Sequence, residues 1–243
     1  MGHVICRCAI VFPVLVGLAV SGRIADAQEK EPAKKQIKKV EVGRNIFVEV
    51  EDRKVVRVLV QAAVCLRQGS LEHLLTRRRC KEHEAILAAD IDARDLHKSL
   101  LLLGLREGKS IVFKPKEVPP SGSGVKITLA YKKDGKEIKV PAKQWIRHAQ
   151  TKKNLHTDWV FVGSRFMGAE DNPAKVYYLG NDGDVICVAN FEAAVLDLPI
   201  LSPATGVNDY EAHTERIPAV ETPVLVILEP VRAKKKQKRL DEP

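Results

Sequence analysis

The stretch Ile46–Val60, with the sequence IFVEVEDRKVVRVLV, decides the fold class. β-branched and aromatic residues fill both of its halves, and Asp52-Arg53 interrupts them in the middle. Two such runs around a short polar turn are typical of a β-hairpin. The segments 126–131 and 137–140 repeat this pattern around Asp134-Gly135, a dipeptide that favours tight hairpin turns. The sequence therefore predicts a fold that is rich in hairpins of short strands.

Other short apolar runs of four to six residues also predict strands, and they lie at 84–89, 159–164, 176–179, 184–188, 195–199 and 223–228. The runs 176–179 and 184–188 flank Asn181-Asp-Gly, so they predict a further hairpin. With the hairpins described above, the total is about ten short strands.

Only one segment has clear helical spacing. Leu96, Leu100 and Leu103 repeat at helical intervals after Asp92, which is a good N-capping residue, and Gly104 ends the pattern. We therefore expect an α+β domain that has a mainly antiparallel sheet of short strands and hairpins, with one helix over about 93–103.

Residues 1–27 have the pattern of a cleavable signal peptide. Arg7 precedes an uncharged apolar run from Ala9 to Val20, and Ala25-Asp-Ala27 is a cleavage site of the A-x-A type. The alternative is an uncleaved membrane anchor, but the run is shorter than the roughly 20 apolar residues that a spanning helix needs. We therefore expect a periplasmic or secreted protein whose mature chain begins near Gln28 and has no transmembrane span.

The positive charge of the chain lies mainly at its two ends. The 243 residues have a formal net charge of +9, of which 232–243 contribute +4, 28–42 contribute +2 and 1–27 contribute +1. Segments of this composition are typically solvated, so 28–42 is predicted as a charged flexible linker and 232–243 as a basic disordered tail. The alternative interpretation of the tail is that its residues 232–239 contact an anionic surface. The nearly neutral domain between them, 43–231, does not indicate nucleic-acid binding.

Cleavage after Ala27 leaves three cysteines, Cys65, Cys80 and Cys187. Three thiols allow one disulfide and one free thiol, and the sequence leaves the pairing open. None of them forms a C-x₂-C pair, and a [4Fe–4S] cluster usually needs four cysteines, so an iron–sulfur cluster is not expected. Cys80 follows three arginines, which favour its thiolate and make it the most reactive thiol of the three.

Reactive side chains are most concentrated between residues 72 and 97, and they are Glu72, His73, Cys80, His83, Glu84 and His97. Histidine, cysteine and carboxylates are the ligands that zinc and similar ions prefer. The spacing Cys80-x-x-His83 suits one ion, which leads to a predicted site of Cys80, His83 and His97. Glu72 or Glu84 would be its fourth ligand or a proton carrier.

Two other interpretations of these residues stay open. Glu84 precedes an apolar run, so it needs a buried partner such as Arg94 or His97, and a structural polar network would then explain the cluster. The remaining interpretation is that these residues are scattered over the surface without a common role.

The first functional hypothesis is accordingly a non-enzymatic module that binds a ligand or partner, either a protein or a component of the cell envelope. The alternative is a metal- or thiol-dependent enzyme or redox protein that uses Cys80, His83, Glu84 and His97.

An ordered series of motifs extends over most of the chain, and it comprises Gly69-x-Leu-Glu72, Cys80-x-x-His83-Glu-Ala, Leu96-His-x-Ser-Leu-Leu, Trp159-Val-Phe-x-Gly-Ser164, Gly183-Asp-x-Ile-Cys187, Leu196-Asp-Leu-Pro199 and Thr214-Glu-x-Ile-Pro218. With this series the chain resembles the YdjY-domain proteins, which are secreted or periplasmic proteins abundant in planctomycete-type bacteria. The resemblance covers about 55–228 and implies no settled activity, although some members are labelled as ferredoxin-like. At 78–80 this chain has Arg-Arg-Cys where the family often has a Gly-Thr loop, so no role is transferred to that loop.

Overall fold

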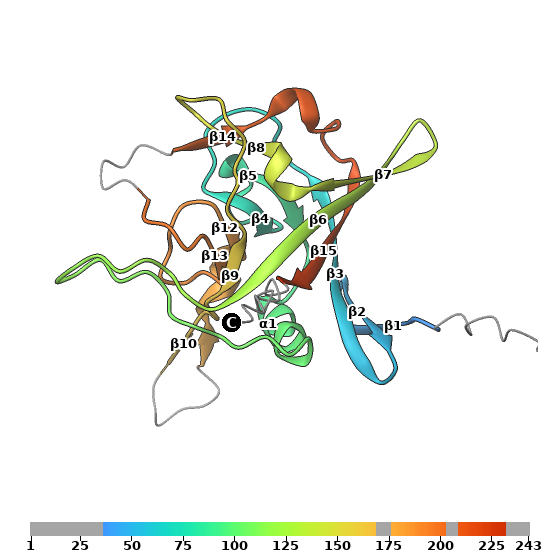
Figure 1. Ribbon diagram of the computed structural model, residues 1–243, viewed down its shortest axis with the longest axis horizontal. Coiled ribbons are helices and arrows are strands. Elements are labelled where there is room, and N and C mark those ends of the chain that lie inside the picture. Colours follow the sequence, from blue (N-terminus) through green and yellow to red (C-terminus); the bar gives the residue numbers. More distant parts are fainter. Residues whose placement is uncertain (1–35, 169–175, 203–208, 232–243) are drawn as a thin grey trace, which may run out of the picture. The chain divides into compact units, whose positions relative to one another are not determined.

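The computed structural model describes residues 36–168, 176–202 and 209–231 (Figure 1). The predicted signal peptide, the first part of the predicted linker and the predicted basic tail lie outside these residues. Within the described residues, no helix has both the length and the apolar character needed to span a membrane.

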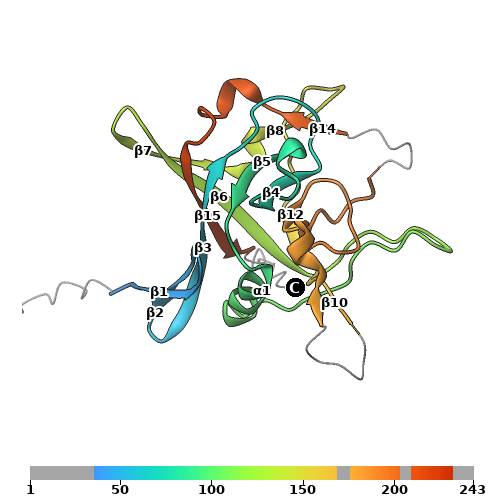
Figure 2. The ribbon, with the colours of Figure 1, turned by 180° about the vertical axis from the view of Figure 1, so that it is seen from behind.

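Eight strands form a closed β-barrel. In order around the wall they are β3 (Lys54–Val64), β15 (Pro223–Pro230), β6 (Ser123–Lys133), β9 (Trp159–Phe161), β13 (Leu196–Asp197), β12 (Ile186–Cys187), β4 (His73–Arg77) and β5 (Ala85–Ala89). The barrel closes because β5 also pairs with β3. Seen from behind, β4, β5 and β12 lie together beside the wall of β3, β15 and β6 (Figure 2).

Other strands extend or flank this barrel. β1 (Lys38–Gly43) and β2 (Ile46–Glu51) continue the sheet from β3, and β7 (Lys136–Pro141) pairs with β6. Two small antiparallel pairs lie outside the main sheet, and they are β8 (Ile146–His148) with β14 (Tyr210–Ala212) and β10 (Phe166–Met167) with β11 (Tyr177–Tyr178). Short 3-10 turns cover Glu82–Glu84, Ala142–Trp145, Leu179–Asp182 and Thr214–Arg216.

The predicted α+β class is therefore wrong, because the described structure is mostly β and its main sheet closes on itself. Closure depends on pairings between segments that are distant in sequence. β3 meets β5 through Ala63↔Ala88 and Val64↔Leu87, and the pairs β4–β5 and β12–β13 are parallel. Local alternation and turn residues predict hairpins, but they carry no information about such long-range pairings.

The core fills the inside of the barrel. Alternate side chains of the long strands face the core, as Val58 and Val60 in β3 and Val224, Val226 and Leu228 in β15 illustrate. Each fully buried valine or leucine contributes roughly 1.5–3 kcal/mol relative to an exposed one. The alternation of apolar and polar side chains thus fixes the pairing register of these strands, since a slip by one residue would turn the apolar face toward water.

The predicted helix is confirmed as α1, Ala93–Leu102. The carboxylate of Asp92 accepts a hydrogen bond from the backbone N–H of Arg94, which caps the first turn. Leu96 and Leu100 are fully buried, and the helix packs against β1, β2 and β3 at one end of the barrel (Figure 1).

The local predictions have mixed outcomes. The hairpins at 46–60 and 126–140 are confirmed as β2–β3 and β6–β7. The hairpin predicted across 176–188 is wrong, because β11 pairs with β10 whereas β12 pairs with β4 and β13. Residues 38–42, predicted as the end of the flexible linker, belong to strand β1, whose Val40 and Val42 pack against the core.

Candidate functional site

His73, the first residue of β4, lies at the centre of a buried polar cluster. Its side chain is fully buried, and the ring stacks on Phe191 with 5.0 Å between ring centroids and 18° between the planes. Its Nε2 lies 2.8 Å from Oδ1 of Asp184, in the segment just before β12. We use the name His73 cluster for Glu72, His73, Lys81, Glu84 and Asp184.

One carboxylate oxygen of Asp184, Oδ1, has two hydrogen-bond partners. The ammonium of Lys81 lies 2.6 Å from the same Oδ1, and it also lies 4.6 Å from the centroid of the Phe191 ring. Burial alone would raise the pKa of Asp184, but the hydrogen bonds with His73 and Lys81 bring it below its ordinary value. Asp184 is therefore a carboxylate, which accepts a hydrogen bond from the Nε2–H of His73.

The other ring nitrogen of His73 has a different environment. Nδ1 is buried, and the described residues offer it no hydrogen-bond partner. Oε1 of Glu84 lies 4.0 Å away, and one ligand atom each of Glu72, His73 and Glu84 lie within 4.8 Å of one another. Burial, followed by the charge of Glu84, raises the pKa of Glu72. Two carboxylates and one imidazole nitrogen thus face a common point.

A second group of potential metal ligands shares His73 with the first. His73, Asp184 and Cys187 also bring ligand atoms within 4.8 Å of one another. Burial raises the pKa of the Cys187 thiol well above its ordinary value, so this sulfur is protonated. Cys65 is similar, because burial raises its pKa to about 12 and its Sγ donates to the carbonyl of Ala85 at 3.0 Å. All three described cysteines are free thiols.

Asp197, in β13, is a buried acid in an apolar strand, which requires a polar partner. Its Oδ1 accepts hydrogen bonds from the backbone N–H of Leu198 at 2.7 Å and from Nδ2 of Asn190 at 3.1 Å. Burial nevertheless raises its pKa to about 7.

The structure separates the residues that the sequence analysis grouped. His83 is exposed over 78% of its side chain, and its Nε2 lies 3.6 Å from Oε2 of Glu84. The thiol of Cys80 lies 3.9 Å from the carbonyl oxygen of Asn181. His97 is in α1, where its Nδ1 lies 2.8 Å from the hydroxyl of Tyr178 and burial lowers its pKa.

Of the predicted site residues, Glu72 and Glu84 therefore lie together with His73, and the exposed ring of His83 contacts the other oxygen of Glu84. Within the described residues, neither group of clustered ligand atoms includes Cys80, His83 or His97. The metal site and the enzyme alternative based on those three stay predictions. Glu84 has His73 and His83 as its neighbours, whereas Arg94, which was one of its expected partners, pairs with Asp92.

Sequence reasoning missed the importance of His73, Lys81 and Asp184. A usable signal was present for His73, because it lies among the leucines of 71–75, where a buried polar side chain needs a partner. Asp184 had no comparable signal, since it follows Asn181-Asp-Gly and has the sequence character of a turn residue. Its pairing with His73 joins residues 111 positions apart.

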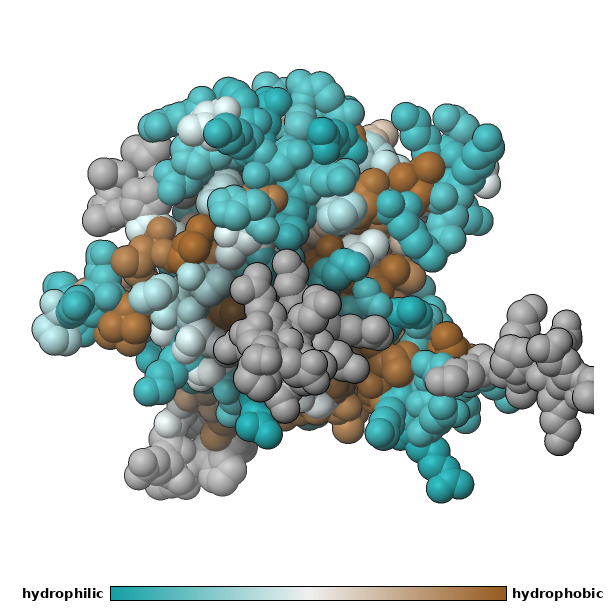
Figure 3. Space-filling view, in the orientation of Figure 1, coloured by the Kyte–Doolittle hydropathy of each residue, from teal (hydrophilic) through white to brown (hydrophobic). Residues whose placement is uncertain are grey.

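A second candidate site is a groove of about 790 Å³ on the outside of the barrel. Its floor includes Gln61 of β3, Leu225 of β15 and Ala130 of β6, which form one row because Leu225 pairs with both of the others. We call this the outer groove. In Figure 3, apolar surface lies in the hollow between the β6–β7 hairpin at upper right and the β1–β2 hairpin below it.

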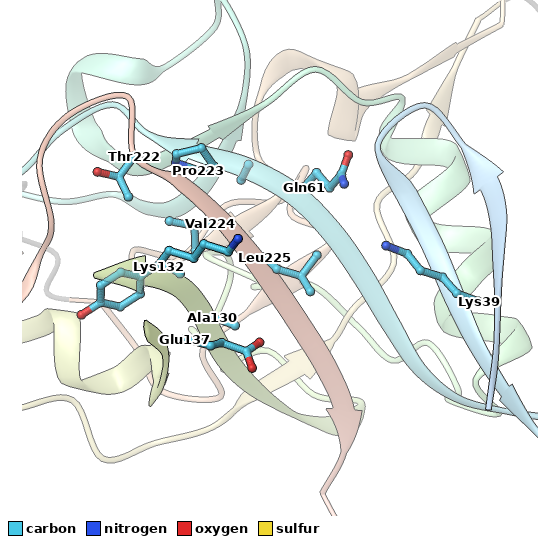
Figure 4. A pocket seen from close by; sticks show the side chains of 11 residues that line it. Lys39, Gln61, Ala130, Lys132, Glu137, Thr222, Pro223, Val224 and Leu225 are labelled. Atoms are coloured by element: carbon cyan, nitrogen blue, oxygen red, sulfur yellow. The ribbon is translucent and has the colours of Figure 1, made fainter. Parts of the chain in front are cut away.

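Lysines line both sides of the outer groove. Lys39 reaches toward Leu225 from the β1–β2 hairpin, and Lys132 lies on the opposite side with Glu137 (Figure 4). Glu137 pairs with Lys139 at 3.5 Å. Among the described residues, no carboxylate forms an ion pair with Lys39 or Lys132. The groove thus combines an apolar floor with two lysines that lack anionic partners in the described part of the chain.

Fold and site together define a closed β-barrel domain with a buried charged cluster in one wall and an open groove outside the other. A model of the YdjY domain matches residues 46–229, and the chain belongs to the YdjY-domain family. No curated protein and no solved structure matches the sequence. The family resemblance inferred from the ordered motifs is therefore confirmed, and the matched range covers the whole barrel except the last residue of β15.

Proposed function

We propose that this protein is an exported, non-enzymatic binding module, whose outer groove holds an extended acidic segment of a partner protein. The observation that carries the proposal is the outer groove itself, because it joins an apolar floor to two lysines from opposite hairpins. Export is supported by the signal-peptide pattern of residues 1–27.

The shape of the floor favours an extended occupant. Side chains of β3, β15 and β6 stand in rows across the sheet, with Gln61, Leu225 and Ala130 in one row. A partner segment in β conformation places alternate side chains on one face, about 7 Å apart. Such a segment presents apolar side chains to Leu225 and keeps its polar ones toward the lysines.

The charge of the groove favours an acidic occupant. Lys39 and Lys132 lie on opposite sides, so carboxylates at both margins of one segment reach a lysine. Complementary charge mainly raises the association rate and selects among partners. The net positive charge that remains after cleavage, +9 less the +1 of residues 1–27, acts in the same direction at long range.

The test uses two synthetic peptides of about ten residues, one alternating valine with aspartate and one alternating valine with lysine. We expect the aspartate peptide to bind and to shift the amide NMR signals of Gln61, Leu225 and Ala130. The double variant Lys39→Glu/Lys132→Glu should weaken that binding at least tenfold, since it places two acids beside the peptide carboxylates.

The matched control is Lys116→Glu/Lys153→Glu, which makes the same change in net charge at two exposed lysines outside the groove. An equal loss of affinity in this control would show that only net charge matters and would overturn the proposal. Equal binding of the lysine peptide would do the same. Binding of phosphatidylglycerol vesicles without any response to the aspartate peptide would replace the protein partner by a membrane.

A further inference from the structure

The buried Nδ1 of His73 has the position of a metal ligand. Asp184 is a carboxylate that accepts from Nε2–H, and Lys81 holds it in place. An N–H at Nε2 places the lone pair of a neutral ring on Nδ1, which has no hydrogen-bond partner among the described residues. A carboxylate that fixes the tautomer of a ligating histidine in this way is a recurrent feature of protein metal sites.

The lone pair points to a region that two carboxylates share. The ligand atoms of Glu72, His73 and Glu84 lie within 4.8 Å of one another, and Oε1 of Glu84 is 4.0 Å from Nδ1. A divalent cation between this nitrogen and the two carboxylates would offset the repulsion among them. The ammonium of Lys81 pairs instead with Oδ1 of Asp184 at 2.6 Å, the oxygen that lies beside the other ring nitrogen, Nε2.

We propose that Nδ1 of His73 and the carboxylates of Glu72 and Glu84 bind one divalent transition-metal ion of the zinc type. One nitrogen and two oxygens suit such an ion better than Mg²⁺ or Ca²⁺, which prefer oxygen ligands throughout. Glu84 keeps about a fifth of its side chain exposed, so the ion has access from solvent.

The ion would link the N-terminal ends of the parallel strands β4 and β5. Glu72 and His73 lie where β4 begins, Glu84 directly precedes β5, and His73 is opposite Ala85 in the register. The backbone N–H of Glu72 already donates to the carbonyl of Glu84 at 3.0 Å. Since β5 also pairs with β3, binding at this point would strengthen the seam that closes the barrel.

The proposed site differs from the set predicted from sequence, and a substitution at His83 distinguishes between the two sites experimentally. His83 is exposed and contacts the outward oxygen Oε2 of Glu84, whereas Oε1 faces His73. A variant that removes His83 therefore leaves the ligands proposed here intact, but it removes a central ligand of the set Cys80, His83 and His97.

The test is calorimetric titration of Zn²⁺ into chelator-treated protein that was purified without a histidine tag. We expect one saturable site per chain and a rise in the melting temperature on zinc addition. Glu72→Gln and Glu84→Gln keep the side-chain size, and each should weaken zinc binding at least tenfold. His83→Ala should bind as the unchanged protein does.

Absence of a saturable site, or binding that both glutamine variants retain, would overturn the proposal. Loss of binding in His83→Ala alone would move the ion to the set predicted from sequence. Because removal of His73 could unfold the domain, its role is read without mutation, from a change in the ¹⁵N chemical shift of its Nδ1 when zinc is added. An unchanged Nδ1 signal at zinc saturation would exclude His73 as a ligand.

Discussion

Strands β3 and β6 on one side of the barrel have 11 residues each, whereas β12 and β13 on the other side have two each. The long strands pair without interruption through β15 and direct alternate side chains toward the core. The short strands β12 and β13 pair with each other in parallel, and β12 pairs with β4 in an irregular register. We call these two sides the regular wall (β3, β15, β6) and the irregular wall (β4, β5, β12, β13).

The two walls are stabilised by different interactions. The regular wall relies on apolar alternation and on the ladder of backbone hydrogen bonds. In the irregular wall, side chains bond to the backbone of distant segments: the hydroxyl of Thr76 donates to the carbonyl of Gly183 at 2.9 Å, and Nη1 of Arg77 donates to that of Asn181 at 2.7 Å. The comparison indicates that buried polar contacts replace strand length where the strands are short.

The largest expected effect is that of Asp184→Ala in the irregular wall. This substitution leaves the buried His73 and the ammonium of Lys81 without their shared partner, which costs about 3–5 kcal/mol of unfolding free energy. Urea unfolding followed by circular dichroism measures the loss. Asp182→Ala, which removes only an exposed acid that bonds to Tyr177, is the control and should cost less than about 1 kcal/mol. Equal losses in both variants would contradict a special role for the His73 cluster.

A second effect depends on pH and comes from Asp197. Its folded pKa is about 7 against an ordinary value of 3.8, so the folded protein retains a proton that the unfolded chain releases between these values. The stabilisation is complete below about pH 4 and is lost as the pH rises to about 7, with a slope of at most about 1.4 kcal/mol per pH unit.

We therefore compare the unfolding free energies of the unchanged protein and Asp197→Asn from pH 4 to 8. The unchanged protein should lose stability relative to the variant as the pH increases, because asparagine cannot ionise. Parallel curves would show that Asp197 is ionised in the folded state throughout and that its three N–H donors outweigh its burial.

The smallest effect is expected for a charged residue of the regular wall. Arg57 pairs with Glu49 at 2.6 Å and with Glu229 at 2.9 Å, but its side chain is 39% exposed. Arg57→Ala should therefore cost no more than about 1 kcal/mol, since exposed ion pairs contribute little. This variant and Asp184→Ala each remove one charge with two partners, so a similar loss in both would contradict the distinction between the walls.

The regular wall is also the part that the sequence predicts best. The hairpins at 46–60 and 126–140 follow from alternation and turn residues, and the helix at 93–102 follows from leucine spacing and the cap at Asp92. Strands of two residues, such as β12 and β13, are too short to show a period. Their parallel pairing, and hence the closure of the barrel, depends on contacts between distant segments that no local pattern encodes.

The site was predictable to a similar degree. Sequence reasoning found the region, and it included Glu72 and Glu84, because reactive side chains are concentrated there. It placed His83 in the centre, since the spacing from Cys80 suits a metal ion, whereas the fold exposes His83 and buries His73. Which histidine faces the carboxylates depends on the 3-10 turn at 82–84 and on Asp184, and neither is visible in the spacing.

The position of β15 has a consequence for the time at which the domain can fold. β15 is the last described strand in chain order, yet it lies between β3 and β6. Until residues 223–230 are available, the facing edges of the two longest strands, β3 and β6, lack the strand that pairs with both of them. We expect the barrel to assemble only after residues 223–230 have left the ribosome, so that the order of synthesis delays closure until the end of the domain is made.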